Sequence, residues 1–351
     1  MLNRTISAII AIGACVAVQA QGICNIKGYM TADNGTRKVY LSRIDENGVQ
    51  AVVDSAKVKK GIFSLKYKLK EGEPTLLYNI IMGSTTAEVF VEPGTVEVNS
   101  NNGAVSVSGT AANDTYAQFK AIGSKECSAK EAIKTRAEQI RFLIDNNASP
   151  VAPYAMEKDL VPGLSKTYAG QLVKSVSSEL HSHPYYLSLR NTVLARDMRE
   201  GNEMPDIVLP LRDGTTKRLS DYRGKYILLD FWASWCAPCI KEIPHLQELY
   251  NETKANSDKF AIISFSLDTK AEAWNAAIEK HNMGQEGWTH ASQLGGWESQ
   301  VARLLDVNSI PKMILIDPEG RIISLNILGS EVTGKVKQIL SGDLYYLDQE
   351  K

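Results

Sequence analysis

The sequence predicts a C-terminal α/β domain that follows a small all-β domain and a helical segment. Short β-branched and aromatic runs fill residues 24–109, and apolar residues recur every three or four positions from residue 113 to about 200. After Pro205, strand patterns alternate with helix patterns. The expected boundaries are a signal peptide over 1–20, a β-rich domain over 21–110, a helical segment and linker over 111–200, and the α/β domain over 203–351.

Residues 1–20 are predicted to be a cleaved export signal. A positive charge precedes an uncharged apolar run that is short for a membrane span, which needs about 20 residues. Val18 and Ala20 give the small-residue pattern of a cleavage site, so Gln21 is the expected first mature residue. The stretch "IGAC" leaves a lipidated Cys15 open as an alternative. Either form would leave the cytoplasm.

The β-rich region contains seven runs that predict strands: "KVYLSRI", "VQAVVDSAKV", "GIFSLKYKL", "TLLYNIIM", "AEVFVE", "TVEVNS" and "AVSVSG". Strands at this spacing are typical of a small sandwich or open barrel. The region holds no His, Cys or carboxylate cluster suited to catalysis. A docking or spacer role is therefore the simplest interpretation.

Amphipathic patterns predict helices over 115–126, 128–147 and 166–182. His181 and His183 alternate before a proline and lack an acidic or cysteine partner nearby, so we interpret them as a helix end and loop and not as metal ligands. The polar stretch "REGNEMPD", residues 199–206, is expected to be a linker.

The C-terminal region begins with an expected hairpin around Asp213 and Gly214. The nearly continuous apolar run "YILLDF" predicts the buried centre of a sheet. Further strands are expected at "FAIISFSL" and in a hairpin over "KMILIDPEGRIISLNIL", with helices at "CIKEIPHLQELYNETK", "AEAWNAAIEKH", "WESQVARLL" and from about Glu331.

Composition excludes some classes of function. The chain has 351 residues, of which 44% are hydrophobic and 23% charged, as expected for a globular protein of several domains. The net charge is −1 without a concentrated basic patch, which argues against a nucleic-acid partner. Neither a cofactor nor a bound metal is expected.

Two of the five cysteines form the one motif suited to chemistry, in "FWASWCAPCIKEIPHL". A structural zinc site would need a second ligand pair, and a structural disulfide across two residues would contribute little stability. Cys236 instead follows a strand and begins a helix, where amide donors and the helix dipole stabilise a thiolate. Cys239, one turn later, can resolve a mixed disulfide. The pattern predicts a redox pair, while Cys24 and Cys127 could be paired or free.

The segment "LLDFWASWCAPCIKEIP" resembles the active-site segment of thioredoxin-fold proteins. The longer stretch "MPDIVLPLRDGTTKRLSDYRGKYILLDFWASWC" resembles the TlpA/ResA-like branch of exported thiol–disulfide oxidoreductases, and the likeness covers residues 203 to about 341. It implies a thioredoxin-like fold, with a central mixed sheet flanked by helices, in the periplasm or cell envelope. The β-rich segment resembles a domain of unassigned function that precedes such modules in envelope proteins.

The resemblance also implies roles for individual residues. Cys236 corresponds to the nucleophile, Cys239 to the buried resolving thiol and Asp230 to a buried carboxylate that relays a proton. A polar strand end facing solvent is the alternative for Asp230. The implied substrate-binding residues are Trp235, Pro238, Ile310 and Pro311, with a cis peptide bond before Pro311.

One position departs from thioredoxin, which places a lysine beside that carboxylate. The next strand, "FAIISFSLD", supplies no lysine, and Ser264 is expected at the matching place. Without the cation, Asp230 should favour its neutral form. Glu242 is similar to an acidic residue of the ResA-like branch, but we interpret it as part of a solvated helix face.

The expected partners are protein dithiols and disulfides of the envelope, with a membrane electron donor or acceptor also possible. An aliphatic residue before the cis-proline, here Ile310, resembles the pattern of family members that act as reductants more than that of strong oxidants. A peroxiredoxin-like peroxidase is one alternative, but its Pro-x-x-x-Thr/Ser-x-x-Cys loop is absent. A non-catalytic envelope binding protein with a redox tether is the other.

Overall fold

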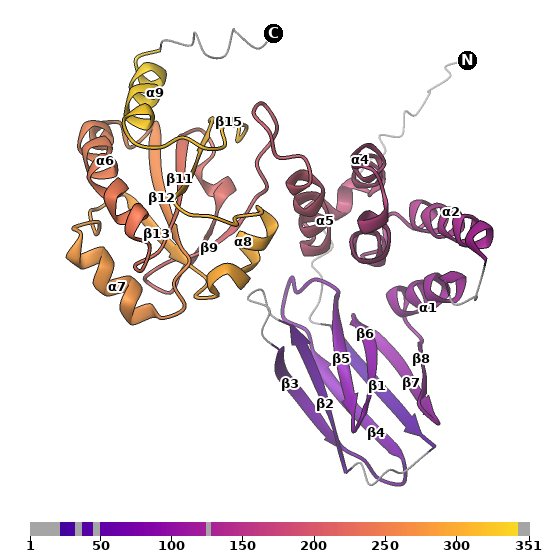
Figure 1. Ribbon diagram of the computed structural model, residues 1–351. Helices are drawn as coiled ribbons and strands as arrows, with labels where there is room; N and C mark the ends of the chain where they lie inside the picture. Colours follow the sequence, from indigo (N-terminus) through magenta and orange to yellow (C-terminus); the bar gives the residue numbers. More distant parts are fainter. Residues whose placement is uncertain (1–21, 32–36, 45–49, 124–127, 343–351) are drawn as a thin grey trace, which may run out of the picture. The chain divides into compact units, whose positions relative to one another are not determined.

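A computed structural model describes residues 22–31, 37–44, 50–123 and 128–342 (Figure 1). The expected signal over 1–20, with Cys15, and also Cys127 lie outside this part of the chain. The chain divides between Ala117 and Gln118 into two compact units, which are described separately. The expected domain boundaries stay a prediction.

The first unit is a β-sandwich of two four-stranded sheets, as its strand runs predict. One sheet has the order β4-β1-β7-β8 and the other β3-β2-β5-β6. Alternate residues of both sheets point into a shared apolar core. The strands are β1 (Ile23–Met30), β2 (Lys38–Ile44), β3 (Gln50–Lys57), β4 (Ile62–Lys68), β5 (Leu76–Met82), β6 (Thr85–Val91), β7 (Gly94–Asn101) and β8 (Ala104–Ser108).

Strand β1 is missing from the seven runs that the sequence indicates. It pairs antiparallel with β4 and parallel with β7, inside its sheet. Gly28 interrupts its apolar pattern, and the ring of Phe63 packs over that glycine. A Cβ atom at Gly28 would lie 1.9 Å from the Phe63 ring, so packing against Phe63 requires glycine here. The same glycine breaks the sequence pattern from which β1 could have been predicted.

Helices dominate the chain after the sandwich. They are α1 (Ala111–Gly123), α2 (Ala129–Asp145), α3 (Val151–Ala155), α4 (Lys166–Ser175) and α5 (Pro184–Ala195). The three predicted helices correspond to α1, α2 and α4. Helix α5 was not predicted as a separate helix. His183 caps its N-terminus, where Nδ1 accepts a hydrogen bond from the backbone N–H of Tyr185 (3.2 Å).

The linker interpretation of residues 199–206 is wrong, because this segment is fixed to the C-terminal sheet. The backbone N–H of Gly201 donates to the carbonyl of Ile322 (2.8 Å), and that of Met204 donates to the carbonyl of Gly320 (2.9 Å). The Met204 side chain is buried in the C-terminal core. These contacts hold the segment beside β15 (Ile322–Ser324).

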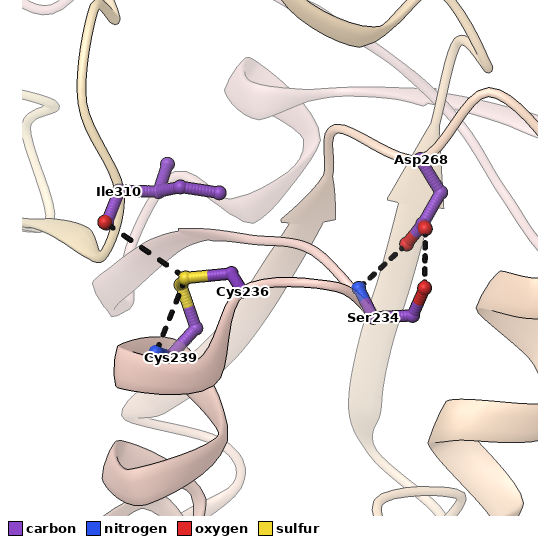
Figure 2. Close-up of a disulfide and its surroundings, with 5 residues drawn as sticks. All are labelled: Ser234, Cys236, Cys239, Asp268 and Ile310. Carbon is purple, nitrogen blue, oxygen red and sulfur yellow. Dashed lines mark hydrogen bonds between the residues drawn. A yellow bond between two sulfur atoms is a disulfide. The ribbon is translucent and has the colours of Figure 1, made fainter.

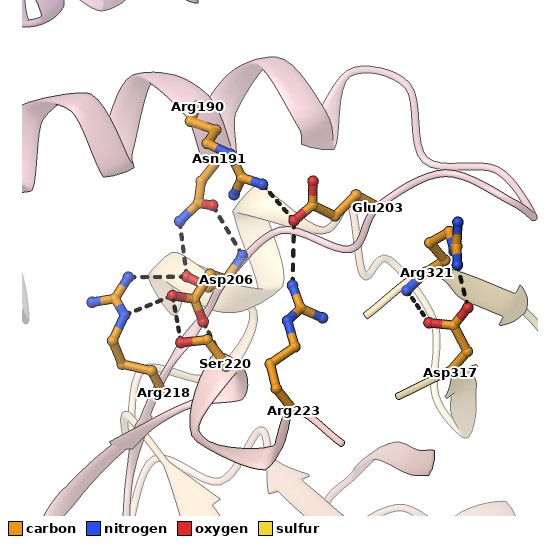
Figure 3. A network of polar contacts seen from close by, with 9 residues as sticks. All are labelled: Arg190, Asn191, Glu203, Asp206, Arg218, Ser220, Arg223, Asp317 and Arg321. Carbon is orange, nitrogen blue, oxygen red and sulfur yellow. Dashed lines mark hydrogen bonds and ion pairs between the residues drawn. The ribbon is translucent and has the colours of Figure 1, made fainter. Parts of the chain in front are cut away.

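Ion pairs and hydrogen bonds also join α5 to the start of the C-terminal fold (Figure 3). Oδ1 of Asn191 accepts a hydrogen bond from the backbone N–H of Asp206 (2.9 Å), and Nδ2 of Asn191 donates to the Asp206 carbonyl (2.8 Å). The Asp206 carboxylate accepts from Nε of Arg218 (2.7 Å) and from the backbone N–H of Ser220 (2.8 Å). Asp206, at the end of the supposed linker, thus has partners 12 to 15 residues away in the sequence.

The C-terminal fold is a five-stranded mixed sheet flanked by helices, as predicted (Figure 1). Its strand order is β13-β12-β11-β14-β15, with β11 at the centre, parallel to β12 and antiparallel to β14. The predicted hairpin at residues 213–214 joins β9 (Val208–Pro210) to β10 (Thr216–Arg218). The other elements are β11 (Tyr226–Trp232), α6 (Ala237–Thr253), β12 (Phe260–Ser266), α7 (Ala271–Lys280), β13 (Trp288–Ser292), α8 (Gln300–Leu304), β14 (Lys312–Ile316) and α9 (Ser330–Leu340).

Strand β13 was not predicted, because "WTHAS" is short and polar. It pairs parallel with β12, so the C-terminal ends of β11, β12 and β13 meet at one edge of the sheet. Loops at such an edge are where α/β folds place functional groups. Among the described residues, no helix is both long and apolar enough to cross a membrane.

Candidate active site

The CxxC pair lies where the central strand β11 passes into α6 (Figure 2). Cys236 is the N-cap residue of α6, and Cys239 lies in its first turn. Pro238 also occupies the first turn, where an N–H would have no intrahelical partner. The two sulfurs form a disulfide.

The sulfur of Cys236 accepts a hydrogen bond from the backbone N–H of Cys239 (3.2 Å). The helix dipole and this amide favour negative charge on that sulfur when the disulfide is reduced. Burial does not distinguish the two cysteine residues, because Cys236 is 4% exposed and Cys239 3%. The position at the helix N-terminus is therefore the feature that separates them.

The loop before β14 faces this sulfur, as predicted. The peptide bond between Ile310 and Pro311 is cis. The carbonyl oxygen of Ile310 lies 3.8 Å from Sγ of Cys236 (Figure 2). A disulfide sulfur carries no hydrogen, so this is a contact between the two atoms and becomes a possible hydrogen bond only in the reduced thiol.

A buried carboxylate that sequence reasoning missed holds the loop before Cys236. Oδ1 of Asp268 accepts from the Ser234 hydroxyl (2.6 Å), and Oδ2 accepts from the Ser234 backbone N–H (3.0 Å; Figure 2). The Ser266 hydroxyl donates to Oδ2 as well (2.7 Å). An aspartate directly after a buried parallel strand was the available signal, since its side chain lies at the same sheet edge as the CxxC loop.

Exposed aromatic side chains lie next to the disulfide. Trp235 precedes Cys236 and is 56% exposed. Its ring contacts Trp297, which is 40% exposed, with the ring centres 6.2 Å apart. Trp297 was not predicted as a site residue, because it was assigned to the start of the expected helix "WESQVARLL", which in the structure begins only at Gln300.

Asp230 is buried in β11, so the alternative of a strand end facing solvent is wrong. Strand register places it opposite Ser264, whose hydroxyl donates to Oδ2 of Asp230 (2.9 Å). Ser264 therefore stands where the sequence predicts it. Burial raises the pKa of Asp230 from 3.8 to about 7, the Ser264 hydrogen bond opposes that rise, and the charge of Glu242 adds to it.

Glu242 does not belong to a solvated helix face, so that interpretation is wrong. Its side chain is half-buried, and Oε2 accepts a hydrogen bond from the backbone N–H of Gly329 (2.8 Å). Its negative charge also raises the pKa of the buried Asp230 carboxyl. Sequence periodicity could not reveal a partner 87 residues away.

One further cysteine, Cys24, lies in the described part of the chain. Cys24 is a buried free thiol in β1, and burial is the main reason that its pKa rises to about 11. A thiol with that pKa is largely unreactive at neutral pH. Within the described ranges, no cluster of three His, Cys, Asp or Glu residues could hold a metal ion.

Comparison with known families matches both parts of the chain. Residues 224–322 match a family described as thioredoxin-like. Residues 24–116 match a domain of unknown function, DUF4369. The sequence prediction of a redox module preceded by a domain of unassigned function is thus confirmed.

Curated relatives are similar over the C-terminal part. The chain is 27% identical over 158 residues to the thiol-disulfide oxidoreductase ResA of Bacillus subtilis, covering 44% of this chain and 80% of that protein. It is 30% identical over 155 residues to ResA of Geobacillus thermodenitrificans, covering 40% and 75%. A solved thiol-disulfide oxidoreductase from Bacteroides fragilis is 34% identical, with a TM-score of 0.37 and coverage of 39% and 99%.

Proposed function

Because this chain belongs to the ResA-like family of thiol–disulfide oxidoreductases, we propose that it is exported and reduces disulfides of envelope proteins with Cys236 and Cys239. The observation that carries the proposal is the position of the pair. The Cys236 sulfur accepts a hydrogen bond from the Cys239 backbone N–H in the first turn of α6 and faces the cis-proline loop. This arrangement stabilises a thiolate beside a surface on which a partner can dock.

The reaction consists of two exchanges. The reduced enzyme begins with a Cys236 thiolate, which attacks one sulfur of a substrate disulfide; a mixed disulfide forms and the first substrate thiolate leaves. Cys239 then loses its proton and attacks the Cys236 sulfur, so the mixed disulfide breaks and the second substrate thiolate leaves. Two electrons have passed to the substrate, and the enzyme holds the observed disulfide. A dithiol reductant, for example one supplied through a membrane electron donor, must reduce it again.

Cys236 is the proposed nucleophile because its sulfur caps α6. The helix dipole and the Cys239 amide stabilise the thiolate at that position more than one turn further on. Trp235, Pro238, Ile310 and Pro311 line the approach to this sulfur in the proposal. Their positions before the pair, within it and on the facing loop support that role.

Asp230 is the proposed acceptor of the Cys239 proton, directly or through one water. With a pKa of about 7, the buried carboxyl is present in both protonation states near neutral pH. It can therefore take up a proton in one exchange and return it in the reverse exchange. A carboxylate held permanently charged by a lysine would accept the proton less readily.

Trapping of partners tests the proposal. The Cys239→Ser protein should accumulate mixed disulfides with envelope proteins, visible on non-reducing gels, because attack proceeds and resolution cannot. Cys236→Ser should trap none. Cys24→Ser is the control, since its buried thiol lies in the sandwich, and it should exchange disulfides like the wild type. Equal trapping by Cys236→Ser and Cys239→Ser would refute the assignment of the nucleophile.

Export is supported by the sequence pattern of residues 1–20. N-terminal sequencing of the protein recovered from the envelope of an expressing cell should begin at Gln21. A mature chain beginning at a lipid-modified Cys15 would replace the cleaved-signal proposal by an anchored form.

A further inference from the structure

A hydrogen-bonded chain runs across three neighbouring strands and ends at Asp230. The indole N–H of Trp288, on β13, donates to the hydroxyl oxygen of Ser264, on β12 (3.0 Å). The Ser264 hydroxyl in turn donates to Oδ2 of Asp230, on β11 (2.9 Å). All three side chains are buried. The parallel register pairs Asp230 with Ser264, whereas Trp288 lies opposite Ile262, two residues before Ser264 on β12.

The direction of the two bonds gives the chain its chemical effect. A hydroxyl has one hydrogen, and because the Ser264 oxygen already accepts the indole N–H, that hydrogen is oriented toward Asp230. Successive donors pointing the same way polarise one another, so the indole strengthens the bond that Ser264 donates. A donated hydrogen bond stabilises the charged carboxylate more than the neutral acid. The chain therefore lowers the affinity of Asp230 for a proton without placing a cation beside it.

None of the charged or titratable groups named below donates a hydrogen bond to Asp230, so the stabilisation of its carboxylate comes from the neutral donors. Glu242, on α6, is the group whose charge raises the Asp230 pKa. His290, on β13, is neutral near pH 7, because burial lowers its pKa to about 4. Lys312, on β14, places Nζ 3.5 Å from a carbonyl of residue 305. Tyr250, on α6, donates its hydroxyl to a backbone carbonyl of residue 286.

Packing fixes the donor in place. The Trp288 ring is buried and makes stacked contacts with the rings of Tyr250 and His290, with ring centres 5.8 and 5.7 Å away. An indole packed in this way has little rotamer freedom, so its N–H stays directed at Ser264. Two other buried tryptophans, Trp232 and Trp274, have no hydrogen-bond partner for their indole nitrogens among the described residues.

We propose that Trp288 is a positioning residue that tunes the proton affinity of Asp230 through Ser264. The inference rests on the proposed role of Asp230 in proton transfer and adds a residue remote from the sulfurs. It explains how a site without the lysine of thioredoxin keeps its carboxyl from becoming fully neutral after burial. Loss of either donor should raise the pH at which Asp230 ionises.

The wild-type full chain provides the first test. NMR of the oxidised protein would follow the Asp230 carboxyl carbon, assigned by its loss in Asp230→Asn, and the indole N–H signals through a pH titration. The Trp288 signal should move with the same midpoint as Asp230, because ionisation strengthens both hydrogen bonds. The Trp274 signal should not follow that midpoint. A Trp288 signal that ignores the ionisation of Asp230 would overturn the proposal.

Substitution provides the second test, again in the full chain. Ser264→Ala should raise the Asp230 midpoint by about one pH unit or more, since a bond to a charged group contributes about 1.5–3 kcal/mol. Trp288→Phe should raise it by about half a unit, the share expected of a polarising second donor. The matched control is Trp274→Phe, which removes a buried indole N–H that lacks a partner.

The double variant decides whether Trp288 acts through Ser264. If it does, Ser264→Ala combined with Trp288→Phe should shift the midpoint no further than Ser264→Ala alone. Additive shifts, or a Trp288→Phe shift equal to that of Trp274→Phe, would overturn the inference. The titration needs no turnover, so its failure is distinguishable from failure of the proposed disulfide exchange. Resolution of a mixed disulfide, measured separately against pH, should follow the same order of midpoints.

Discussion

Replacement of Asp230 by asparagine should stabilise the thioredoxin-like fold at neutral pH. The carboxamide oxygen can still accept the Ser264 hydroxyl, which lies 2.9 Å from the carboxylate, so the change is nearly isosteric. It removes a negative charge from a buried position whose hydrogen-bond partner is the neutral Ser264 hydroxyl. Burial of an unpaired charge lowers the free energy of unfolding, and the neutral asparagine avoids this loss.

The size of the effect follows from proton linkage. Asp230 ionises at about 7 in the folded protein against an ordinary value of 3.8, so the folded wild type binds the proton more tightly than the unfolded chain does. The wild type therefore loses stability as the pH rises between these values, by up to about 1.4 kcal/mol per pH unit. The advantage of Asp230→Asn should be about 4 kcal/mol at pH 7 to 8 and less than about 1 kcal/mol at pH 4.

Urea unfolding followed by tryptophan fluorescence measures this difference in the full chain. All five tryptophans, at 232, 235, 274, 288 and 297, lie in the thioredoxin-like part, so the signal reports on that fold without a contribution from the sandwich. The two proteins should be compared in oxidised form at several values between pH 4 and 8. A difference that does not change with pH would refute the raised pKa of Asp230 and the reasoning from burial.

Three other substitutions test the packing around the site. Asp268→Ala should lower the free energy of unfolding by about 1–3 kcal/mol and slow disulfide exchange, because it leaves Ser234 without its buried acceptor. Urea unfolding measures the first effect and stopped-flow exchange the second. A normal exchange rate would contradict the role of Asp268 in holding the loop before Cys236. Trp297→Ala should raise KM for a protein disulfide and leave the reaction with a small disulfide unchanged, since it removes one ring of the exposed pair formed with Trp235. A lower rate with both substrates would contradict a role in docking and indicate a folding defect. Gly28→Ala should destabilise the sandwich by about 1–3 kcal/mol, because its Cβ would meet the Phe63 ring. Thermal unfolding followed by circular dichroism should then show a lower midpoint for the sandwich, and an unchanged midpoint would refute this reasoning.

The sequence alone determined the features that depend on neighbouring residues. Short β-branched and aromatic runs predicted seven of the eight described strands of the sandwich, and the sequence patterns after Pro205 also predicted β11, β12 and β14. The cysteine spacing, between a buried strand and a helix, predicted the redox pair. The resemblance to thioredoxin added the cis bond before Pro311 and the place of Ser264 beside Asp230.

Only the tertiary structure decided which polar groups bond one another. Asp268 meets Ser234, and Glu242 meets Gly329, across 34 and 87 residues of sequence. The segment 199–206 looks like a linker from its polar composition, but the backbone of residues 320 and 322 and side chains of α5 and of residues 218–223 bind it. Periodicity records which side of an element faces the core, since burial of apolar area follows from local spacing. A hydrogen bond instead depends on the register and separation of two distant segments, which exist only after the chain has folded.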